Sequence, residues 1–239
     1  MCTLEQRGNI FYLTLTGEDE HRLHPDLIVS IRSALAQANS QVVKGSALIT
    51  TAHGKFFSNG FDLRYAQEAG SAEAAMERLV NMVELFKPLV TDFISLRMPT
   101  VAAITGHAAA AGLMLAMCHD YVTMRSDQGV LYMSELDIGM TLPDYFTALI
   151  RSKISSAPAR RALVLRAMKI KADEAVQMGI VHSDHANGED AFRAAVHLGE
   201  DLAKNRWNGT AYAEIRKSLH PELCVILGIS DVPVLPSHL

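Results

Sequence analysis

The sequence predicts a single α/β fold, because two strand patterns each lead through a small-residue turn into a helix pattern. Residues 100–104 (TVAAI) are β-branched and apolar, and Gly106, four alanines and Gly112 follow them before an apolar helical run. Residues 46–50 (SALIT) form the other strand pattern, which continues through residues 55–58 to Asn59-Gly60. Asp62 then stands where a carboxylate caps the next helix.

The two turns have the composition of a site that holds negative charge. Small residues let a ligand or another backbone come close, and the first amides of a helix have no intrahelical acceptor. Two turns of this kind can direct two backbone amides at one oxygen. For a single run such as residues 108–111 (AAAA), tight packing of a helix on a sheet is the better explanation, and it is the second turn that favours a binding site.

Composition limits the domain number and the class of partner. The 239 residues are 49% hydrophobic with 15 glycines and 8 prolines, which suits one structural domain. We expect a core over residues 1–185 and a helical region over residues 186–239. A net charge of −4 gives no basic surface for nucleic acid, and no apolar run is long enough to span a membrane. The three cysteines lack the spacing of a metal site.

Apolar spacing predicts the remaining elements. Residues 10–16 alternate as a strand. Residues 71–96 have helical spacing, but Pro88 should end or kink that helix. Further helices are expected over residues 25–39, 145–150, 157–168, 187–205 and 209–220.

Four patterns in order give a resemblance to a known family. The run FSNGFDL (residues 57–63), followed by GHAAAAGLMLAMCHD (residues 106–120), resembles the crotonase (enoyl-CoA hydratase/isomerase) superfamily. Gly139 after SELDI and the run KADEAVQMGIV (residues 171–181) also resemble that family. The resemblance implies a spiral of β-β-α units with a C-terminal helical region. It also implies a homo-oligomer, a trimer or a hexamer.

The resemblance implies an oxyanion hole for the thioester carbonyl of an acyl-CoA. Its donors would be the backbone amides of Phe61 and Ala111. Arg22, Lys55 and Lys217 are the corresponding candidates for contacts with the coenzyme A nucleotide and its phosphates. The remaining candidate substrate-binding residues lie along the two turns: Ser58, Asn59, Gly60, Asp62, Leu63, Ala110, Gly112 and Met114.

The residues at the positions of the catalytic acids and bases differ between the activities of this family. Its hydratases carry two glutamates, and this chain has Met114 at the first position and Glu135 at the second. A thioether does not usefully exchange protons, so hydration is disfavoured. The pattern is similar to monofunctional Δ3,Δ2-enoyl-CoA isomerases, in which one carboxylate moves a proton from C2 to C4. We expect an apolar setting to raise the pKa of Glu135.

Other carboxylates and other functions stay open at this stage. Asp144, in the loop after Gly139, is a second candidate base, although it could equally cap the helix that follows. A non-catalytic acyl-CoA-binding module, a dienoyl-CoA isomerase and a thioester hydrolase are the alternatives. We expect no metal, because His107 and His119 are twelve residues apart without a third ligand nearby. Coenzyme A is part of the substrate, so we expect no separate cofactor.

The last three residues suggest a compartment. Ser237-His238-Leu239 resemble the peroxisomal address Ser-Lys-Leu with a different middle residue. Together with the acyl-CoA chemistry, they predict a peroxisomal protein that binds the peroxisomal import receptor.

Overall fold

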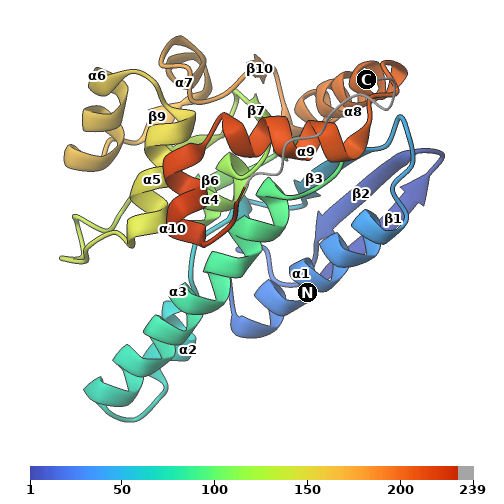
Figure 1. The fold of residues 1–239 in the computed structure, drawn as a ribbon. Coiled ribbons are helices and arrows are strands. Elements are labelled where there is room, and N and C mark those ends of the chain that lie inside the picture. Colours follow the sequence, from blue (N-terminus) through green and yellow to red (C-terminus); the bar gives the residue numbers. More distant parts are fainter. Residues whose placement is uncertain (231–239) are drawn as a thin grey trace.

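The structure is a computed structural model that describes residues 1–230. Within these residues, six strands form the larger of two sheets, in the order β1-β2-β3-β5-β7-β10 (Figure 1). Neighbouring strands are parallel, except for the antiparallel hairpin of β1 and β2. The bounds are β1 (Cys2–Arg7), β2 (Ile10–Leu15), β3 (Ala47–Ala52), β5 (Thr100–Ile104), β7 (Tyr121–Arg125) and β10 (Ser183–His185).

A smaller sheet has the order β4-β6-β8-β9. It consists of β4 (Phe56–Ser58), β6 (His107–Ala109), β8 (Val130–Tyr132) and β9 (Ile170–Lys171). The chain therefore alternates between the sheets: β3, β5 and β7 each belong to the larger sheet, and β4, β6 and β8 directly after them belong to the smaller one. A helix follows each pair. This confirms the expected spiral of β-β-α units.

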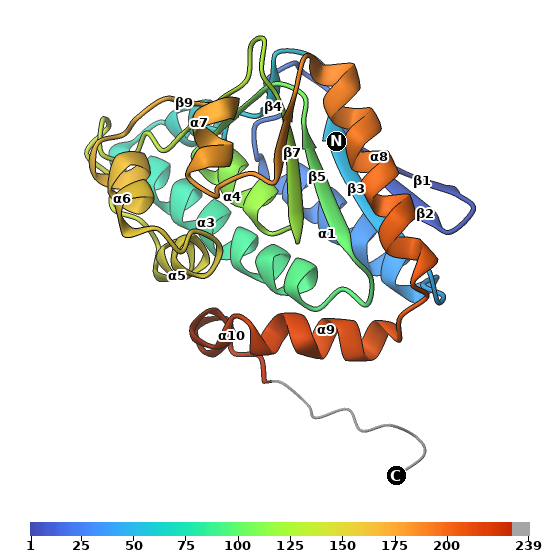
Figure 2. The ribbon, with the colours of Figure 1, turned by 90° about the horizontal axis from the view of Figure 1, so that it is seen from above.

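Helices cover both faces of the larger sheet. Figure 2 shows α8 on one face and α1, α3 and α4 on the other. The helices on the second face and beyond are α1 (Pro25–Ser40), α2 (Leu63–Gln67), α3 (Ala72–Ile94), α4 (Ala111–Met117), α5 (Asp144–Lys153), α6 (Ala157–Arg160) and α7 (Ala172–Gln177). After β10 come α8 (Gly188–Lys204), α9 (Gly209–Ser218) and α10 (Pro221–Leu227).

Burial on both faces explains the composition of the central strands. All six residues of β3 and all five of β5 are buried, so these strands are mainly apolar, with buried threonines and no charged residue. Ile49 and Val101 pack with Ala195 of α8, whereas Leu48 and Ala102 belong to the core cluster on the other face.

Two helix predictions differ from the structure. The helix was expected to end or kink at Pro88, and α3 runs through this residue, so the helix does not end there. Contacts of α1, α2 and α10 with α3 hold it together, and the Tyr145 hydroxyl donates to the Val83 carbonyl one turn before the proline. The single helix expected over residues 157–168 is instead the short α6 followed by a π-helical turn, Arg161–Leu165.

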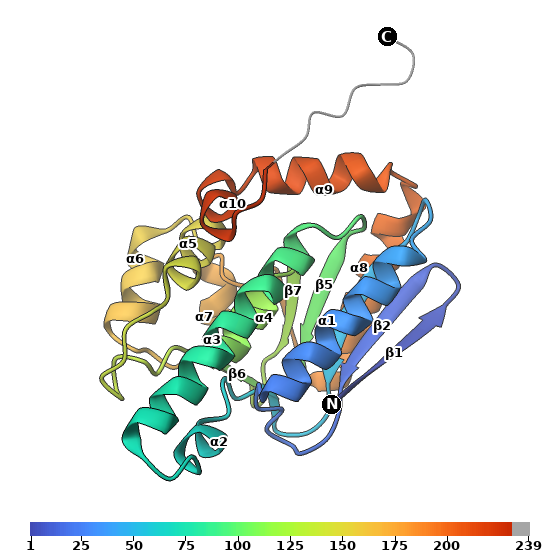
Figure 3. The ribbon, with the colours of Figure 1, turned by 60° about the horizontal axis from the view of Figure 1, so that its bottom comes forward.

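The helix α9 crosses the end of the larger sheet where β5 begins (Figure 3). Arg216 of α9 is 3% exposed, and its Nε lies 2.6 Å from Asp120 Oδ1. The same guanidinium donates to the Leu96 and Met98 carbonyls, both at 2.6 Å. The expected division at residues 185 and 186 stays a prediction. Within the described chain, no helix has the length and apolar character needed to cross a membrane.

Candidate active site

The two small-residue turns lie side by side. Strands β4 and β6 pair in parallel, so the turns that follow them leave the same edge of the smaller sheet. Gly60 has φ +75°, and a Cβ built there would lie 3.1 Å from the Ala109 carbonyl oxygen and 3.5 Å from the Ala111 nitrogen. Gly112 is closer still, because a Cβ there would overlap the Ser58 carbonyl. Both glycines therefore permit backbone contact between the turns.

Two backbone amides at these turns are free to bind a ligand. Within residues 1–230, neither the Phe61 nor the Ala111 N–H has a hydrogen-bond acceptor. Ala110 precedes α4 with φ 49° and ψ −125°, a conformation that favours glycine. Its own N–H donates to the Tyr132 carbonyl at 2.9 Å. That bond fixes the strained residue and thereby the direction of the next amide.

The segment of residues 20–23 holds the first turn in place. The Asn59 N–H donates to the Glu20 carbonyl, and the Leu23 N–H donates to the Gly60 carbonyl, both at 2.8 Å. The buried Ser58 hydroxyl donates to the His21 carbonyl at 2.8 Å. His21 itself is buried with φ 43°, and its Nδ1 lies 2.9 Å from the Phe56 carbonyl oxygen. Sequence reasoning missed this histidine, because no local pattern pairs it with β4.

An aromatic cluster anchors the Phe61 side chain. Its ring contacts Phe86 of α3 edge-on at 5.7 Å and stacks on Phe146 of α5 at 6.1 Å between centroids. Asp62 caps α2 as expected, accepting from the Tyr65 N–H at 3.1 Å. Leu63 is the first residue of α2. The Phe61 amide is thus held by side-chain packing on one side and by a helix cap on the other.

Glu135 lies in the loop after β8, three residues beyond Tyr132. Its Oε2 is buried and has no hydrogen-bond partner in the described structure. Burial raises the pKa of Glu135 above its ordinary value, although hydrogen bonds from its own backbone and that of Ser134 partly oppose this. A carboxylate oxygen without a partner, in a setting that favours the protonated form, can both take and return a proton.

Met114 and Asp144, the other two residues considered for the catalytic base, have different surroundings from Glu135. Met114 is fully buried in α4 and belongs to the main core cluster. Asp144 is exposed and is the first residue of α5, where Pro143 occupies the cap position. The Asp144 Oδ1 accepts from the Tyr145 N–H at 2.7 Å. Asp144 therefore lies in the first turn of a helix, where a carboxylate interacts favourably with the helix dipole.

The three cationic candidates have different surroundings. Arg22 is half-buried and pairs with Glu20, with 2.6 Å between Nε and Oε2. Lys55 is exposed beside β4. Lys217 pairs with Glu214 at 2.8 Å on α9, a helix at the opposite end of the molecule from α2 (Figure 3). Within one chain, Lys217 is thus separated from the turn that precedes α2.

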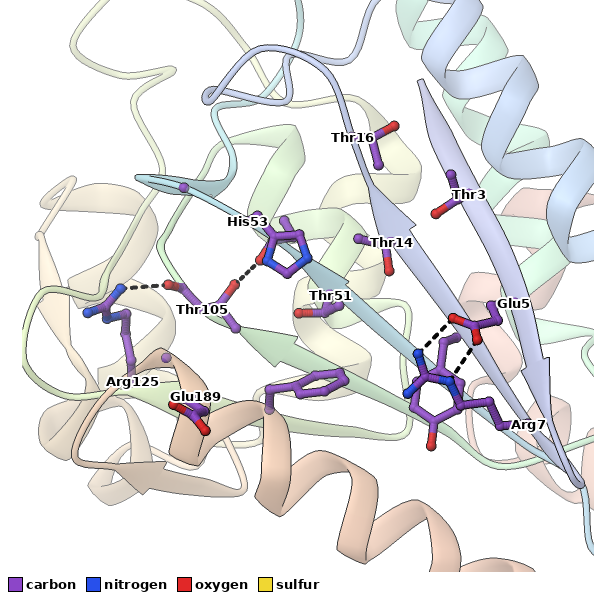
Figure 4. Close-up of a pocket in the computed structure, with 15 residues that line it drawn as sticks. Thr3, Glu5, Arg7, Thr14, Thr16, Thr51, His53, Thr105, Arg125 and Glu189 are labelled. Atoms are coloured by element: carbon purple, nitrogen blue, oxygen red, sulfur yellow. Dashed lines mark hydrogen bonds and ion pairs between the residues drawn. The ribbon is translucent and has the colours of Figure 1, made fainter.

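A cavity of about 680 Å³ lies elsewhere, between the β1–β2 hairpin and the start of α8 (Figure 4). Threonines line much of it, and Arg125 at its edge donates to the Thr105 carbonyl at 2.9 Å. Its lining includes neither of the two small-residue turns, and it does not include Glu135. Among the described side chains, no cluster of three or more histidines, cysteines or carboxylates has the arrangement of a metal site.

Comparisons with known proteins identify the family of the chain. Residues 5–223 match the enoyl-CoA hydratase/isomerase family. Peroxisomal enoyl-CoA delta isomerase 2 of Arabidopsis thaliana is 60% identical over 230 residues, covering 96% of each chain. Peroxisomal enoyl-CoA delta isomerase 1 of the same plant is 48% identical, covering 94% of this chain and 92% of the relative.

A solved structure shows the same fold at lower identity. A probable enoyl-CoA hydratase from Mycobacterium tuberculosis superposes with a TM-score of 0.84 at 21% identity, covering 95% of this chain and 91% of that one. The match over residues 5–223 and the identity to the two plant relatives show the family as well as the fold. The chain belongs to the enoyl-CoA hydratase/isomerase family, the crotonase superfamily.

Proposed function

We propose that this chain moves the double bond of a 3-enoyl-CoA to the 2-trans position, with Glu135 as the only proton carrier. The chain is an enoyl-CoA isomerase, since the plant isomerases align with it from end to end at 48% and 60% identity. The acyl-CoA thioester is its substrate. We propose in addition where the double bond lies before and after the reaction, and which residues carry out the proton transfers.

The proton transfers balance within the substrate. The Glu135 carboxylate removes a proton from C2, and the electron pair of that C–H bond moves towards the thioester to form a dienolate. The Phe61 and Ala111 amides donate to the oxygen that carries the charge. The carboxylic acid then returns the same proton to C4, which leaves the double bond between C2 and C3. No water enters the product.

The buried Oε2 of Glu135 without a partner is the observation that carries the proposal. A carboxylate that served only structure would be hydrogen-bonded at both oxygens or exposed. One positioned general base contributes roughly 10²- to 10⁴-fold to a rate. An oxyanion donor contributes about 3 to 4 kcal/mol. Met114 in place of a second carboxylate disfavours the addition of water.

The test compares the wild type, Glu135→Gln and Asp144→Asn with a 3-enoyl-CoA. Isomerisation is followed by the absorbance of the 2-enoyl thioester, and hydration and thioester hydrolysis are followed in parallel. We expect the wild type to isomerise without hydrating, Asp144→Asn to keep that activity, and Glu135→Gln to lose at least 10²-fold in kcat. Loss of activity in Asp144→Asn alone would assign the base to Asp144.

An inert wild type that still binds acyl-CoA would favour the non-catalytic binding module. Turnover of a dienoyl-CoA in preference to a 3-enoyl-CoA would favour the dienoyl-CoA isomerase, and release of free coenzyme A would favour the hydrolase.

The peroxisome is the compartment of this chain, as the names of the two plant isomerases state for those proteins. The address Ser237-His238-Leu239 lies outside the described residues, so recognition by the import receptor stays part of the proposal. A homotrimer or hexamer likewise stays a proposal. We propose no cofactor besides the coenzyme A of the substrate.

A further inference from the structure

A second cavity lies at the opposite end of α4 from the two small-residue turns. It has a volume of about 360 Å³, and it lies where the end of α4, the start of β7 and the segment after α7 meet. Lys153, the last residue of α5, also lines it, so we call it the Lys153 cavity. Its apolar walls come from four buried side chains, those of Met117, Val122, Ile180 and Val181. No step of the proposed isomerisation uses this cavity.

The Lys153 ammonium has one hydrogen-bond partner among the described residues. Its Nζ donates to the His119 carbonyl at 3.0 Å. In the described part of the chain it forms no salt bridge with a carboxylate. An ammonium has three N–H donors, so this one bond leaves it incompletely satisfied. The side chain is half-buried and the cavity is open to solvent. A small reagent therefore reaches Lys153 through the cavity.

Asp120 also lines the cavity, but other groups already bind its carboxylate. Arg216 Nε lies 2.6 Å from Oδ1, and Arg216 Nη2 lies 2.6 Å from Oδ2. The Thr100 N–H and the Tyr212 hydroxyl also donate to Oδ2. Two cations thus share one carboxylate, and Arg216 binds it directly. The positive charge of Lys153 is left without a counter-ion of its own, which favours release of its proton.

The electrostatics of the cavity favour the neutral amine of Lys153. Burial lowers the pKa of Lys153 below its ordinary value. The charge of Asp120 opposes this effect, and the charge of Arg216 adds to it. A lysine that is desolvated and lies near another cation is an activated nucleophile, because the neutral nitrogen carries the lone pair that reacts. Geometry and charge therefore combine a reactive amine with a space in front of it.

We propose that Lys153 is a site of covalent acylation, with a short-chain acyl-CoA thioester as the acyl donor. The neutral ε-nitrogen attacks the thioester carbonyl carbon and forms an amide bond. The C–S bond breaks, coenzyme A leaves as the thiolate, and the proton displaced from nitrogen passes through solvent to that thiolate. No further reactant is needed, because an enoyl-CoA isomerase works in the presence of acyl-CoA thioesters.

The acylated side chain suits the cavity better than the ammonium does. The amide keeps one N–H for the His119 carbonyl, and it no longer places a second positive charge near Arg216. The cavity has room for a short acyl group. Its apolar walls, which include Met117 and Val181, cover the methyl or methylene groups that the acyl chain adds.

The test measures acetylation of the wild-type protein at each lysine. The protein is incubated with acetyl-CoA, which has no double bond to isomerise, and peptide mass spectrometry gives the rate at each site. Two lysines of the same sample are the controls. Lys44 is exposed in the loop before β3. Lys217 is half-buried like Lys153, but its Nζ forms a salt bridge with Glu214 at 2.8 Å.

We expect Lys153 to be acetylated at pH 7 at least about fivefold faster than Lys44, because a larger fraction of its amine is neutral. Lys217 should react more slowly than Lys153, since the Glu214 carboxylate stabilises its ammonium. The preference for Lys153 should disappear in urea, where the cavity is lost. A rate at Lys153 no higher than the rate at Lys44 or at Lys217 overturns the inference.

A second acyl donor separates the reactivity of Lys153 from binding of the coenzyme. S-acetyl-pantetheine lacks the phosphates and the nucleotide, and it should show the same preference for Lys153. A preference that occurs with acetyl-CoA alone would show that bound coenzyme directs the reaction, and it overturns the inference. Isomerisation of a 3-enoyl-CoA is measured on the same protein. Acetylation at Lys153 without isomerisation would refute the proposed function alone, and isomerisation without preferential acetylation would refute this inference alone.

Discussion

At the scale of single residues, the proposed chemistry depends on a thioether that stands where a hydratase has a carboxylate. Met114 is fully buried, whereas Glu135 has one buried oxygen without a hydrogen-bond partner among the described residues. In the proposed mechanism, both proton transfers depend on the Glu135 carboxyl. Its ionisation should therefore be visible in both rate and stability.

The pH dependence of activity follows from the Glu135 pKa. Because burial raises this pKa and the base must be ionised, we expect kcat/KM to fall as the pH is lowered, with an inflection above the ordinary glutamate value. The measurement is the pH profile of isomerisation with wild type and Asp144→Asn. The two profiles should coincide. An inflection that moves in Asp144→Asn would contradict the role given to Glu135.

The pH dependence of stability has the opposite sign. A carboxyl whose pKa is raised on folding stabilises the protein below its unfolded pKa, and this stabilisation is lost as the pH rises through the folded pKa. Glutamine does not ionise, so Glu135→Gln does not lose this stability as the pH rises through the pKa of Glu135 in the folded protein. We expect the variant to have a higher free energy of unfolding than wild type at neutral pH, and no advantage below the ordinary glutamate pKa. Urea unfolding at both pH values measures this.

Alanine variants of Gly60 and Gly70 distinguish the effect of backbone strain from the effect of contact between the two turns. A Cβ at Gly60 would press on the neighbouring turn, whereas one at Gly70 has nothing within 4 Å, although Gly60 and Gly70 have similar φ values of +75° and +85°. Both alanine variants should lose similar stability from the positive φ. Only Gly60→Ala should lose kcat, by about 10²-fold, because it displaces an oxyanion donor. Equal kcat values would show that the turn adjusts without cost.

At the scale of elements, the helix α3 controls the position of the first turn. Phe86 packs on the Phe61 ring, and Arg78 donates to the Tyr65 carbonyl of α2 at 2.7 Å. The Arg78 guanidinium also lies 4.6 Å from the Tyr65 ring. The short α2, which starts just after the Phe61 amide, is thus held against a long helix rather than by its own length.

Removal of Arg78 should loosen α2 and shift the amide of Phe61. We expect Arg78→Ala to lower kcat about tenfold, since small displacements of a positioned group are costly. Arg78→Lys should recover only part of the rate, because lysine lacks the planar group that covers the ring. Glu77→Ala, exposed on the same helix, is the control and should be unchanged. A drop in stability without a change in kcat would make Arg78 structural only.

At the scale of the whole molecule, one buried ion pair fastens the C-terminal helices to the sheet. The Arg216 guanidinium binds Asp120 through two nitrogens and also donates to carbonyls that precede β5. Asp120 in turn accepts from the Thr100 N–H at 3.0 Å and from the Tyr212 hydroxyl at 3.3 Å. The charge of Arg216 helps to lower the pKa of Asp120 in spite of its burial.

Removing Arg216 leaves the buried Asp120 carboxylate without the cation that hydrogen-bonds it, and the charge of Lys153 compensates only in part. We expect Arg216→Met to lower the free energy of unfolding by about 3 to 5 kcal/mol in urea. Arg7→Met, which breaks the exposed pair with Glu5, should have no measurable effect. A loss in Arg216→Met no larger than in the control would show that α9 is held by apolar packing instead.

The sequence by itself determined the family and the two turns, and it predicted Glu135 as the base with Asp144 as a second candidate. These features are local: a glycine that permits close contact, a helix start with free amides, and a thioether where a hydratase has an acid. Strand and helix positions followed from apolar spacing, because burial imposes that spacing on each element separately. Pro88 was the exception, since α3 continues through it with α1, α2, α9 and α10 packed against α3.

Only the tertiary structure decided how distant residues combine. It brought residues 20–23 against the first turn, placed the Phe86 and Phe146 rings behind Phe61, and joined Arg216 to Asp120. Such contacts join residues far apart in sequence, and no periodicity records them, because the pattern of an element specifies which side is buried and not what covers it.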